Sequence, residues 1–338
     1  MQGLSYFRKM NFEKAKAFSV ELEEMNPPKI CSGYPLVYLE HLLNHKEYYL
    51  DIYTRVFGEI LKKSGKKAEE VSIVDYGCGN GLLGCFAMFC GFGNVIFQDV
   101  DPEFLNSSKA LAKGLHLNDG IYIPGEIENL REQRLRIDAV AGTDVIEHIY
   151  DLDNFFSVLQ ELNAEMISVF TTAANPFNPF IVNRLKQLHR KDEFIGNDGS
   201  GLSGKPHLPF LEIRKKIISS NFPRLKNIEE MSRATRGLKE LDILNAVKNY
   251  ELTNRLPQPA PNFNTCHPLT GSWTERILSE EEYKKLYSKY GFRIEIIPGF
   301  YNNYSTGLKA GKSFLLNTLV ALLGKTFSPF IIITGYKK

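Results

Sequence analysis

Apolar residues recur at helical spacing through the first 66 residues, within residues 12–25 and again within residues 36–63. Side chains three and four positions apart share one face of a helix, so both stretches read as amphipathic helices. Pro27 and Pro28 fall between them, followed by Gly33 and Pro35, and these residues interrupt helices. The pattern therefore predicts a helical N-terminal cap over residues 1–66.

From residue 71 the pattern changes to short β-branched runs that alternate with helical stretches. The helical stretches cover residues 82–90, 103–113 and 153–162. Strands separated by helices in this way are typical of a parallel, doubly wound sheet. The five strand-like runs lie at residues 71–76, 94–99, 121–125, 137–143 and 166–172.

The alternation stops after residue 172 for about 100 residues rich in proline, glycine and asparagine. A loop of that length without its own structure is unusual in a compact domain. We therefore expect residues 176–272 to form an inserted lid or substrate subdomain. The core should then comprise residues 67–175 and 273–338.

The alternation returns at residue 279 and supplies the end of the predicted sheet. Ser279 and Glu282 have the spacing of a capping box, and Gly291 is placed to end the helix that follows. Strands are expected at residues 292–297 and 330–336. Between them, residues 311–324 have an apolar core flanked by lysines, which suits a helix packed on the sheet or one lying on a membrane surface.

Charge and cysteine content limit which partners and which cellular compartment we expect for the protein. The chain has 41 basic and 39 acidic residues, so it lacks a global electrostatic footprint for nucleic acid. Its five cysteines form no C-x-x-C pair, and the N-terminus lacks the apolar segment of a signal peptide. We expect a cytoplasmic protein with reduced thiols, a small-molecule substrate, no nucleic-acid partner and a monomeric or homodimeric state.

The first strand runs into the glycine turn "VDYGCGNGLLG" at residues 74–84, which has two interpretations. Its tail fits the dinucleotide fingerprint G-x-G-x-x-G, which would indicate a nicotinamide-dependent dehydrogenase. However, the strand ends at Asp75, two residues before Gly77, and a carboxylate there suits a cationic amine better than a pyrophosphate. We therefore interpret the spacing of the tail as coincidental.

The turn resembles motif I of the class I S-adenosylmethionine-dependent methyltransferases, and the resemblance extends to "VIFQDVDPEFL", "PGEIENL" and "GTDVIEH". It implies an α/β, Rossmann-like sheet of seven strands whose last two form an antiparallel edge pair. It also implies S-adenosylmethionine as cofactor and S-adenosylhomocysteine as product. The amino-acid end of the cofactor would be held by Asp75, Gly77, Cys78 and Gly79.

The same resemblance assigns the rest of the cofactor site. Asp99 would accept hydrogen bonds from the ribose hydroxyls beside Val100, with Asp101 as the rival residue. Glu126 and Ile127 would flank the adenine. Thr143 and Asp144 would lie at the mouth of the methyl-donor pocket.

His148 closes the segment "DVIEH" and has three possible roles. The segment resembles E-x-x-E-H in ubiquinone-biosynthesis O-methyltransferases and small-RNA 2′-O-methyltransferases, where it supplies ligands to a divalent metal. Here Asp144 replaces the first glutamate, and we do not expect a metal. His148 would then be either a catalytic base that faces the substrate or a structural residue.

A second polar group occurs in "TCHPLTGSWTERILSEEEY" at residues 265–283. We predict His267 as a second catalytic residue and Trp273, Glu275 and Arg276 as substrate-binding residues, because together they could hold a polar substrate. The alternative is an anchor for the lid, with Trp273 buried.

The functional expectation is a methyltransferase that acts at oxygen on a small polar acceptor, such as a sugar or related metabolite. A lipid-linked or quinone-type acceptor at a membrane surface is the first alternative. A scaffold protein that binds S-adenosylmethionine without catalysis is the alternative from another class.

Overall fold

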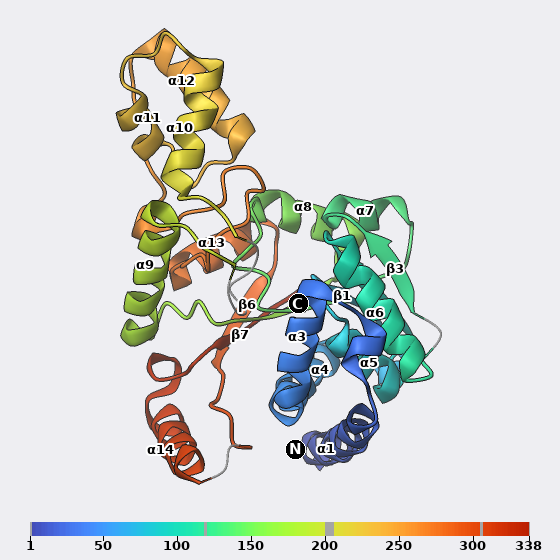
Figure 1. Cartoon of the computed structure of the whole chain (residues 1–338). Helices are drawn as coiled ribbons and strands as arrows, with labels where there is room; N and C mark the ends of the chain where they lie inside the picture. The colour runs from blue at the N-terminus through green and yellow to red at the C-terminus, as the bar shows by residue number, and fades with distance from the viewer. Residues whose placement is uncertain (1, 118–119, 200–205, 305–306, 338) are drawn as a thin grey trace. The chain divides into compact units, whose positions relative to one another are not determined.

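The computed structural model describes residues 2–117, 120–199, 206–304 and 307–337 (Figure 1). The chain folds into two compact units. Unit 1 comprises Met1–Ile146, Asp153–Thr172 and Glu281–Lys338. Unit 2 comprises Glu147–Leu152 and Ala173–Glu280.

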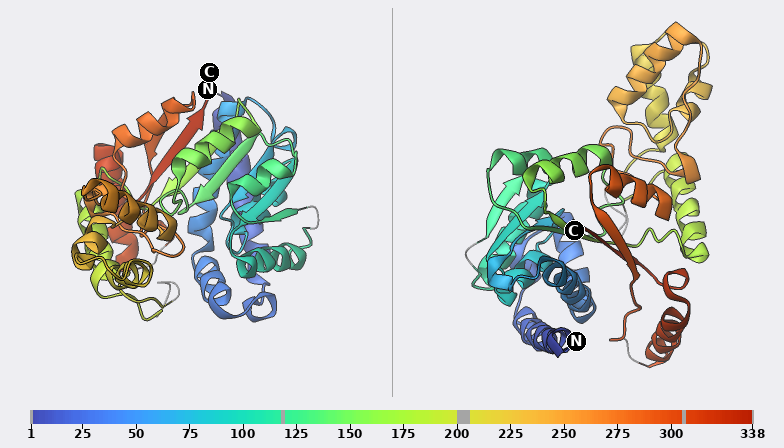
Figure 2. Two further views of the ribbon diagram at one scale, coloured as in Figure 1. Left: turned by 90° about the horizontal axis from the view of Figure 1, so that it is seen from above. Right: turned by 180° about the vertical axis from the view of Figure 1, so that it is seen from behind.

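Unit 1 is built on a seven-stranded sheet in the order β3-β2-β1-β4-β5-β7-β6 (Figures 1 and 2). The first five strands pair in parallel, whereas β7 runs antiparallel to both β5 and β6. The predicted fold class is confirmed, including the antiparallel pair at one edge. The strands are β1 Ser72–Tyr76, β2 Asn94–Asp99, β3 Ile121–Pro124, β4 Ala139–Thr143, β5 Ile167–Thr172, β6 Arg293–Pro298 and β7 Ile331–Tyr336.

Helices cover both faces of this sheet. On one face, Phe57 of α4 and Phe86 of α5 stack with ring centroids 5.5 Å apart, in a core that α1 and α6 also join. On the other face, Phe156 of α8 contacts Tyr287 of α13 at 4.4 Å. The helices are α1 Gln2–Glu23, α2 Pro27–Ile30, α3 Gly33–Asn44, α4 Lys46–Ser64, α5 Leu82–Cys90, α6 Pro102–Gly114, α7 Ile127–Glu132, α8 Leu152–Leu162 and α13 Glu280–Lys289, with the short η1 Ala68–Glu70 before β1.

Gly84 sets how closely α5 packs on the sheet. A Cβ atom at this position would lie 2.3 Å from the ring of Phe97 in β2, a distance that real Cβ contacts do not reach. Gly84 is the last glycine of the G-x-G-x-x-G tail, and close helix–strand packing is the role of that glycine in dinucleotide-binding turns. This packing role needs no dinucleotide, so the interpretation of the tail as coincidental for the choice of cofactor stays a prediction.

The helix between the last two strands, α14 Leu308–Leu323, is followed by the short η3 Gly324–Thr326. Its most exposed apolar residue, Leu308, is 97% exposed, and Val320 is its only buried residue. Most side chains of the apolar stretch at 311–324 are therefore exposed or only partly buried. Among the described helices, none is both long enough and apolar enough to cross a membrane.

Unit 2 is built mainly of helices. Its helices are α9 Pro179–Phe194, α10 Phe210–Asn221, α11 Ile228–Ala234 and α12 Glu240–Thr253, with the short η2 Pro261–Phe263. Asn178 caps α9 by accepting from the N–H of Phe180 at 3.1 Å, and Pro179 occupies the first turn. Asn followed by Pro is a helix-start signal that could have predicted α9. Its role as a lid stays a prediction.

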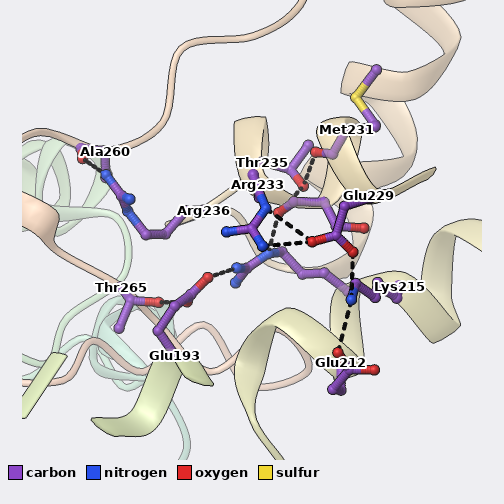
Figure 3. Close-up of polar contacts among 12 residues, drawn as sticks. Glu193, Glu212, Lys215, Glu229, Met231, Arg233, Thr235, Arg236, Ala260 and Thr265 are labelled. Carbon is purple, nitrogen blue, oxygen red and sulfur yellow. Dashed lines mark hydrogen bonds and ion pairs between the residues drawn. The ribbon is translucent and has the colours of Figure 1, made fainter. Parts of the chain in front are cut away.

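A buried ion pair joins the helices of unit 2 (Figure 3). The guanidinium of Arg214 on α10 is fully buried, pairs with Glu193 of α9 and donates from Nε to the carbonyl of Ser232 at 2.8 Å. Glu193 also accepts from Thr265 Oγ1 at 2.8 Å. Because losing one partner would leave an unpaired buried charge, this pair fixes the register of α9 against α10.

We predict that Gly84→Ala lowers the free energy of unfolding by about 1–3 kcal/mol, because the added methyl group overpacks the contact with Phe97. The matched control is Gly58→Ala on α4, where an added Cβ meets no atom within 4 Å. Gly58→Ala should raise stability by up to about 1 kcal/mol, since alanine favours the helix. Urea denaturation of both variants measures this, and equal stabilities would contradict the packing argument.

Candidate functional site

The glycine turn after β1 is held close to its neighbours. Gly77 has a φ of +63°, and a Cβ there would meet the methyl groups of Val145 at 2.8 and 2.9 Å. The Cys78 N–H donates to the carbonyl of Gln98 at 3.0 Å, which ties the turn to the end of β2. Burial raises the pKa of the Cys78 thiol well above its ordinary value, so this thiol is a packing group and not a nucleophile.

Asp75 lies beneath the turn, at the end of β1. It is 3% exposed and accepts a hydrogen bond from the Gly84 N–H at 2.9 Å, which satisfies a donor in the first turn of α5. Burial and, to a smaller extent, the charge of Asp99 raise the pKa of its carboxyl to about 8, although the hydrogen bond from Gly84 lowers it. In this structure Asp75 therefore joins the strand to the helix and favours its protonated form near neutral pH.

Asp99 bridges the glycine turn and the loop after β2. One carboxylate oxygen accepts from the Gly79 N–H at 2.8 Å, and the other accepts from the Asp101 N–H at 2.9 Å. Burial raises the pKa of Asp99, while these two hydrogen bonds lower it. Asp101 instead caps α6 by accepting from the Glu103 N–H at 2.9 Å. The geometry thus favours Asp99 over Asp101 as the acceptor for a ligand.

The segment assigned to adenine recognition lies next to Asp99. The Gly125 N–H donates to the Asp99 carbonyl at 2.9 Å, and Glu126 follows as the exposed N-cap of α7. Val100 is 64% exposed, so its side chain is available to a ligand. Ile127 is 3% exposed, so its side chain belongs mainly to the core and offers little surface to an adenine ring.

Thr143 ends β4, and Asp144 follows it with a φ of +52°. The N–H of Asp144 donates to the carbonyl of Thr171 at 3.0 Å, which orders the loop at the carboxyl end of the sheet. The pKa of Tyr49 is raised to about 12 by burial and by the charge of Asp144. Burial and Asp144 raise the pKa of Tyr38 and Tyr48 in the same way. The N-terminal helices therefore place a group of neutral phenols around Asp144.

Sequence reasoning missed the contribution of α3 to this site. Tyr38 of α3 would lie 3.6 Å from a Cβ at Gly79, and it meets Phe104 of α6 edge-to-face at 5.8 Å. Asn80 is fully buried and donates to the carbonyl of Pro35 at 3.1 Å, which anchors α3 to the turn. Two tyrosines four residues apart, at positions 34 and 38, were the available signal, because they share one helical face.

In unit 2 the structure brings His148 and the segment around Trp273 together. The Trp273 N–H donates to the His148 carbonyl at 3.3 Å, and the Arg276 N–H donates to the Glu147 carbonyl at 3.1 Å. The Nδ1–H of His148 donates to the Trp273 carbonyl at 2.7 Å, which leaves Nε2 with the lone pair that a base needs. Two segments that the sequence presented separately thus form one group.

Trp273 and Arg276 are arranged as an anchor within this group. Trp273 is 6% exposed, and its Nε1–H donates to the carbonyl of Tyr150 at 3.2 Å. The guanidinium of Arg276 lies 4.5 Å from the centroid of the Trp273 ring, a cation–π distance. The indole of Trp273 therefore offers little free surface to a substrate.

Glu275 is the strained member of the group. Its φ is +46°, a left-handed conformation that costs energy for glutamate, and its carbonyl accepts from His189 Nε2 at 3.1 Å. Its Oε2 is buried and has no hydrogen-bond partner among the residues that the structure describes. Strained backbone and unpaired buried acceptors are enriched at functional sites.

His267 lies in a tight turn in unit 2. Its Nδ1 accepts from the backbone N–H groups of Leu269 and Thr270 at 3.3 and 3.4 Å, so Nε2 carries the proton. Burial and the nearby His207 lower the pKa of His267. In this tautomer His267 has no lone pair left for a substrate. Its catalytic role stays a prediction that the geometry does not favour.

Over residues 2–117, 120–199, 206–304 and 307–337 there is no group of three or more histidine, cysteine or carboxylate side chains placed to hold a metal ion. Of the three residues that resemble metal ligands, Asp144 belongs to unit 1, whereas Glu147 and His148 belong to unit 2. His148 uses Nδ1 for the hydrogen bond to Trp273, and Glu147 is fully buried.

Comparison with known proteins gives local sequence identity and distant structural likeness. No protein-family model matches the chain. A ribosomal protein L11 methyltransferase from Pseudoalteromonas atlantica is 36% identical over 72 residues, which cover 21% of this chain and 25% of the relative. The chain thus spans about a quarter of the length of the curated relatives that it matches.

Two of the similar solved structures are S-adenosylmethionine-dependent methyltransferases. The protein from Mesorhizobium loti is 13% identical with a TM-score of 0.42, over 83% of this chain and 98% of that one. A putative S-adenosylmethionine-dependent methyltransferase from Listeria monocytogenes is also 13% identical. Its TM-score is 0.42, over 84% of this chain and 98% of that one. The strand order and the local identity support the resemblance that the motifs gave. The chain has a Rossmann-like α/β fold on a seven-stranded sheet, and part of it is similar in sequence to methyltransferases.

Proposed function

We propose that the protein is an S-adenosylmethionine-dependent methyltransferase. The observation that carries this proposal is the bridge that Asp99 makes between Gly79 and the loop after β2, because it holds a carboxylate at the carboxyl end of the sheet beside a close-packed glycine turn. The Asp99 oxygens accept backbone hydrogen bonds from Gly79 and Asp101, and a carboxylate oxygen can accept more than one hydrogen bond. These residues fit a ribose with two vicinal hydroxyls.

When bound, S-adenosylmethionine supplies a sulfonium methyl group to a nucleophile and leaves as S-adenosylhomocysteine. Asp75, Gly77, Cys78 and Gly79 would hold its amino-acid end, and Asp99, Val100 and Glu126 its nucleoside. Thr143 and Asp144 would border the methyl group. The Tyr38 and Phe104 rings beside the turn would exclude water from this part of the site.

For the acceptor, we infer a small polar molecule that is methylated at oxygen. His148 would take the hydroxyl proton at Nε2 as the oxygen–methyl bond forms, because its Nδ1–H is fixed by the Trp273 carbonyl. The buried Oε2 of Glu275 would accept a hydrogen bond from a second hydroxyl. A lipid-linked or quinone-type acceptor is the second candidate, and the exposed apolar residues of α14 favour it.

Ribose recognition is tested by Asp99→Asn. This change removes a charge-assisted acceptor, so we expect the affinity for S-adenosylmethionine to fall about 10- to 100-fold in calorimetry. Asp101→Asn is the matched control, because asparagine caps a helix as well as aspartate does, and its affinity should stay within about threefold of wild type. Equal losses in both variants, or no binding by the wild type, would contradict the assignment.

The raised pKa of Asp75 predicts proton release on cofactor binding. At pH 7, below its pKa of about 8, the carboxyl mostly holds its proton. A cationic amine nearby favours the ionised form, so binding should release up to about 0.9 proton and tighten as the pH rises from 6 to 8. Calorimetry in phosphate and Tris buffers measures the release, which Asp75→Asn should abolish. Identical release in Asp75→Asn would show that another group titrates.

The acceptor-side base is tested by His148→Gln in a screen of sugars and related polar acceptors with labelled methyl donor. Losing the base should lower kcat about 10²- to 10⁴-fold and leave cofactor affinity unchanged. His267→Gln is the comparison, since Nδ1 of His267 already accepts hydrogen bonds from the backbone of its turn, and its kcat should stay within about threefold of wild type. A larger loss in His267→Gln than in His148→Gln would reverse the two roles.

A further inference from the structure

The helix α14 presents a stripe of exposed leucines to solvent, which we call the apolar stripe. Leu308, Leu315 and Leu322 are 97%, 61% and 75% exposed, and they are seven residues apart, which places them on one face of the helix. Phe314 and Leu323 add further exposed apolar surface, at 76% and 51%. Single exposed leucines are ordinary, whereas several on one helical face mark a surface that binds something apolar.

The orientation of this stripe is fixed by hydrogen bonds on the opposite side of α14. Asn317 accepts from the Tyr301 N–H at 2.7 Å and donates from Nδ2 to the Tyr301 carbonyl at 3.0 Å. Two residues turn a helix by about 200°, so Asn317 points almost opposite to Leu315. Val320 is buried on the inner side. The hydrogen bonds between Asn317 and Tyr301 thus hold α14 with its apolar stripe facing solvent.

The charge of this part of the chain is wholly positive. Residues 296–338 contain five lysines and no aspartate or glutamate. Lys309 and Lys312 are exposed on α14, and Lys312 is four residues after Leu308 and three before Leu315, so it lies on the same face, between these two leucines. Lys325 follows in η3. The apolar stripe therefore lies beside a row of cationic groups.

We propose that α14 binds the surface of an anionic lipid bilayer. An interfacial helix buries its apolar face at the boundary of the acyl chains, while flanking lysines contact the phosphate groups, and α14 has both features. A second copy of the chain is a poorer occupant, because pairing two α14 stripes would bring lysines together with no acidic residue in 296–338 to neutralise them. The proposal does not depend on methyl transfer.

The test is co-sedimentation of the full chain with phosphatidylcholine vesicles, with and without phosphatidylserine. We expect binding only to the vesicles that contain phosphatidylserine, and weaker binding at high salt. Lys309→Gln with Lys312→Gln should weaken binding roughly 25-fold, at about fivefold for each lysine. Leu315→Gln with Leu322→Gln should weaken it at least about tenfold.

The matched control is Leu241→Gln with Leu252→Gln, which removes two leucines of α12 that are 63% and 85% exposed. This variant should bind vesicles like the wild type. Absence of vesicle binding, or an equal loss in the control, would overturn the proposal. The stripe would instead be assigned to self-association if the wild type does not bind vesicles but is a dimer in light scattering. In that case Leu315→Gln with Leu322→Gln should be monomeric. Circular dichroism confirms that each variant is folded. Calorimetry with S-adenosylmethionine tests the proposed function separately, so failure of one proposal is distinguishable from failure of the other.

Discussion

The close approach of α5 to the sheet is the constraint on which the proposed site depends. Gly84 lets the helix lie against Phe97, and this contact places the first turn of α5 directly above Asp75. The turn between them then has little freedom, so Gly79 points its N–H at Asp99. A bulkier residue at position 84 would lift the helix and separate these groups. The hydrogen bonds of the turn therefore depend on packing in the core.

The fold and the proposed cofactor residues could be predicted because their signals are local. Each strand is a short β-branched run, and Asp75 and Asp99 stand at strand ends, where a parallel sheet gathers its side chains at one edge. Tyr34 and Tyr38 mark one helical face of α3, but the sequence does not reveal that this face packs on the turn 40 residues later. The pairing of His148 with Trp273 is also non-local, since 125 residues separate them.

Local patterns left two questions open. Periodicity gave α14 two interpretations, a helix on the sheet or one on a membrane surface, because it does not reveal which face has a neighbour; the bonds of Asn317 show which side faces Tyr301. The packing role of Gly84 was not predicted, because spacing alone cannot report a contact with Phe97. A one-dimensional pattern records where a side chain could pack, and the partner surface decides whether it does.

The anchoring of α3 has a kinetic consequence. Asn80 donates a hydrogen bond to the carbonyl of Pro35, and the Tyr38 ring lies beside Gly79. The helix α3 therefore forms one wall of the turn that we assign to the cofactor. A ligand enclosed by such a wall exchanges with solvent only when the wall loosens. Changes in α3 would then alter residence time more than intrinsic affinity. The N-terminal helices would act as a gate on turnover as well as a cover for the sheet.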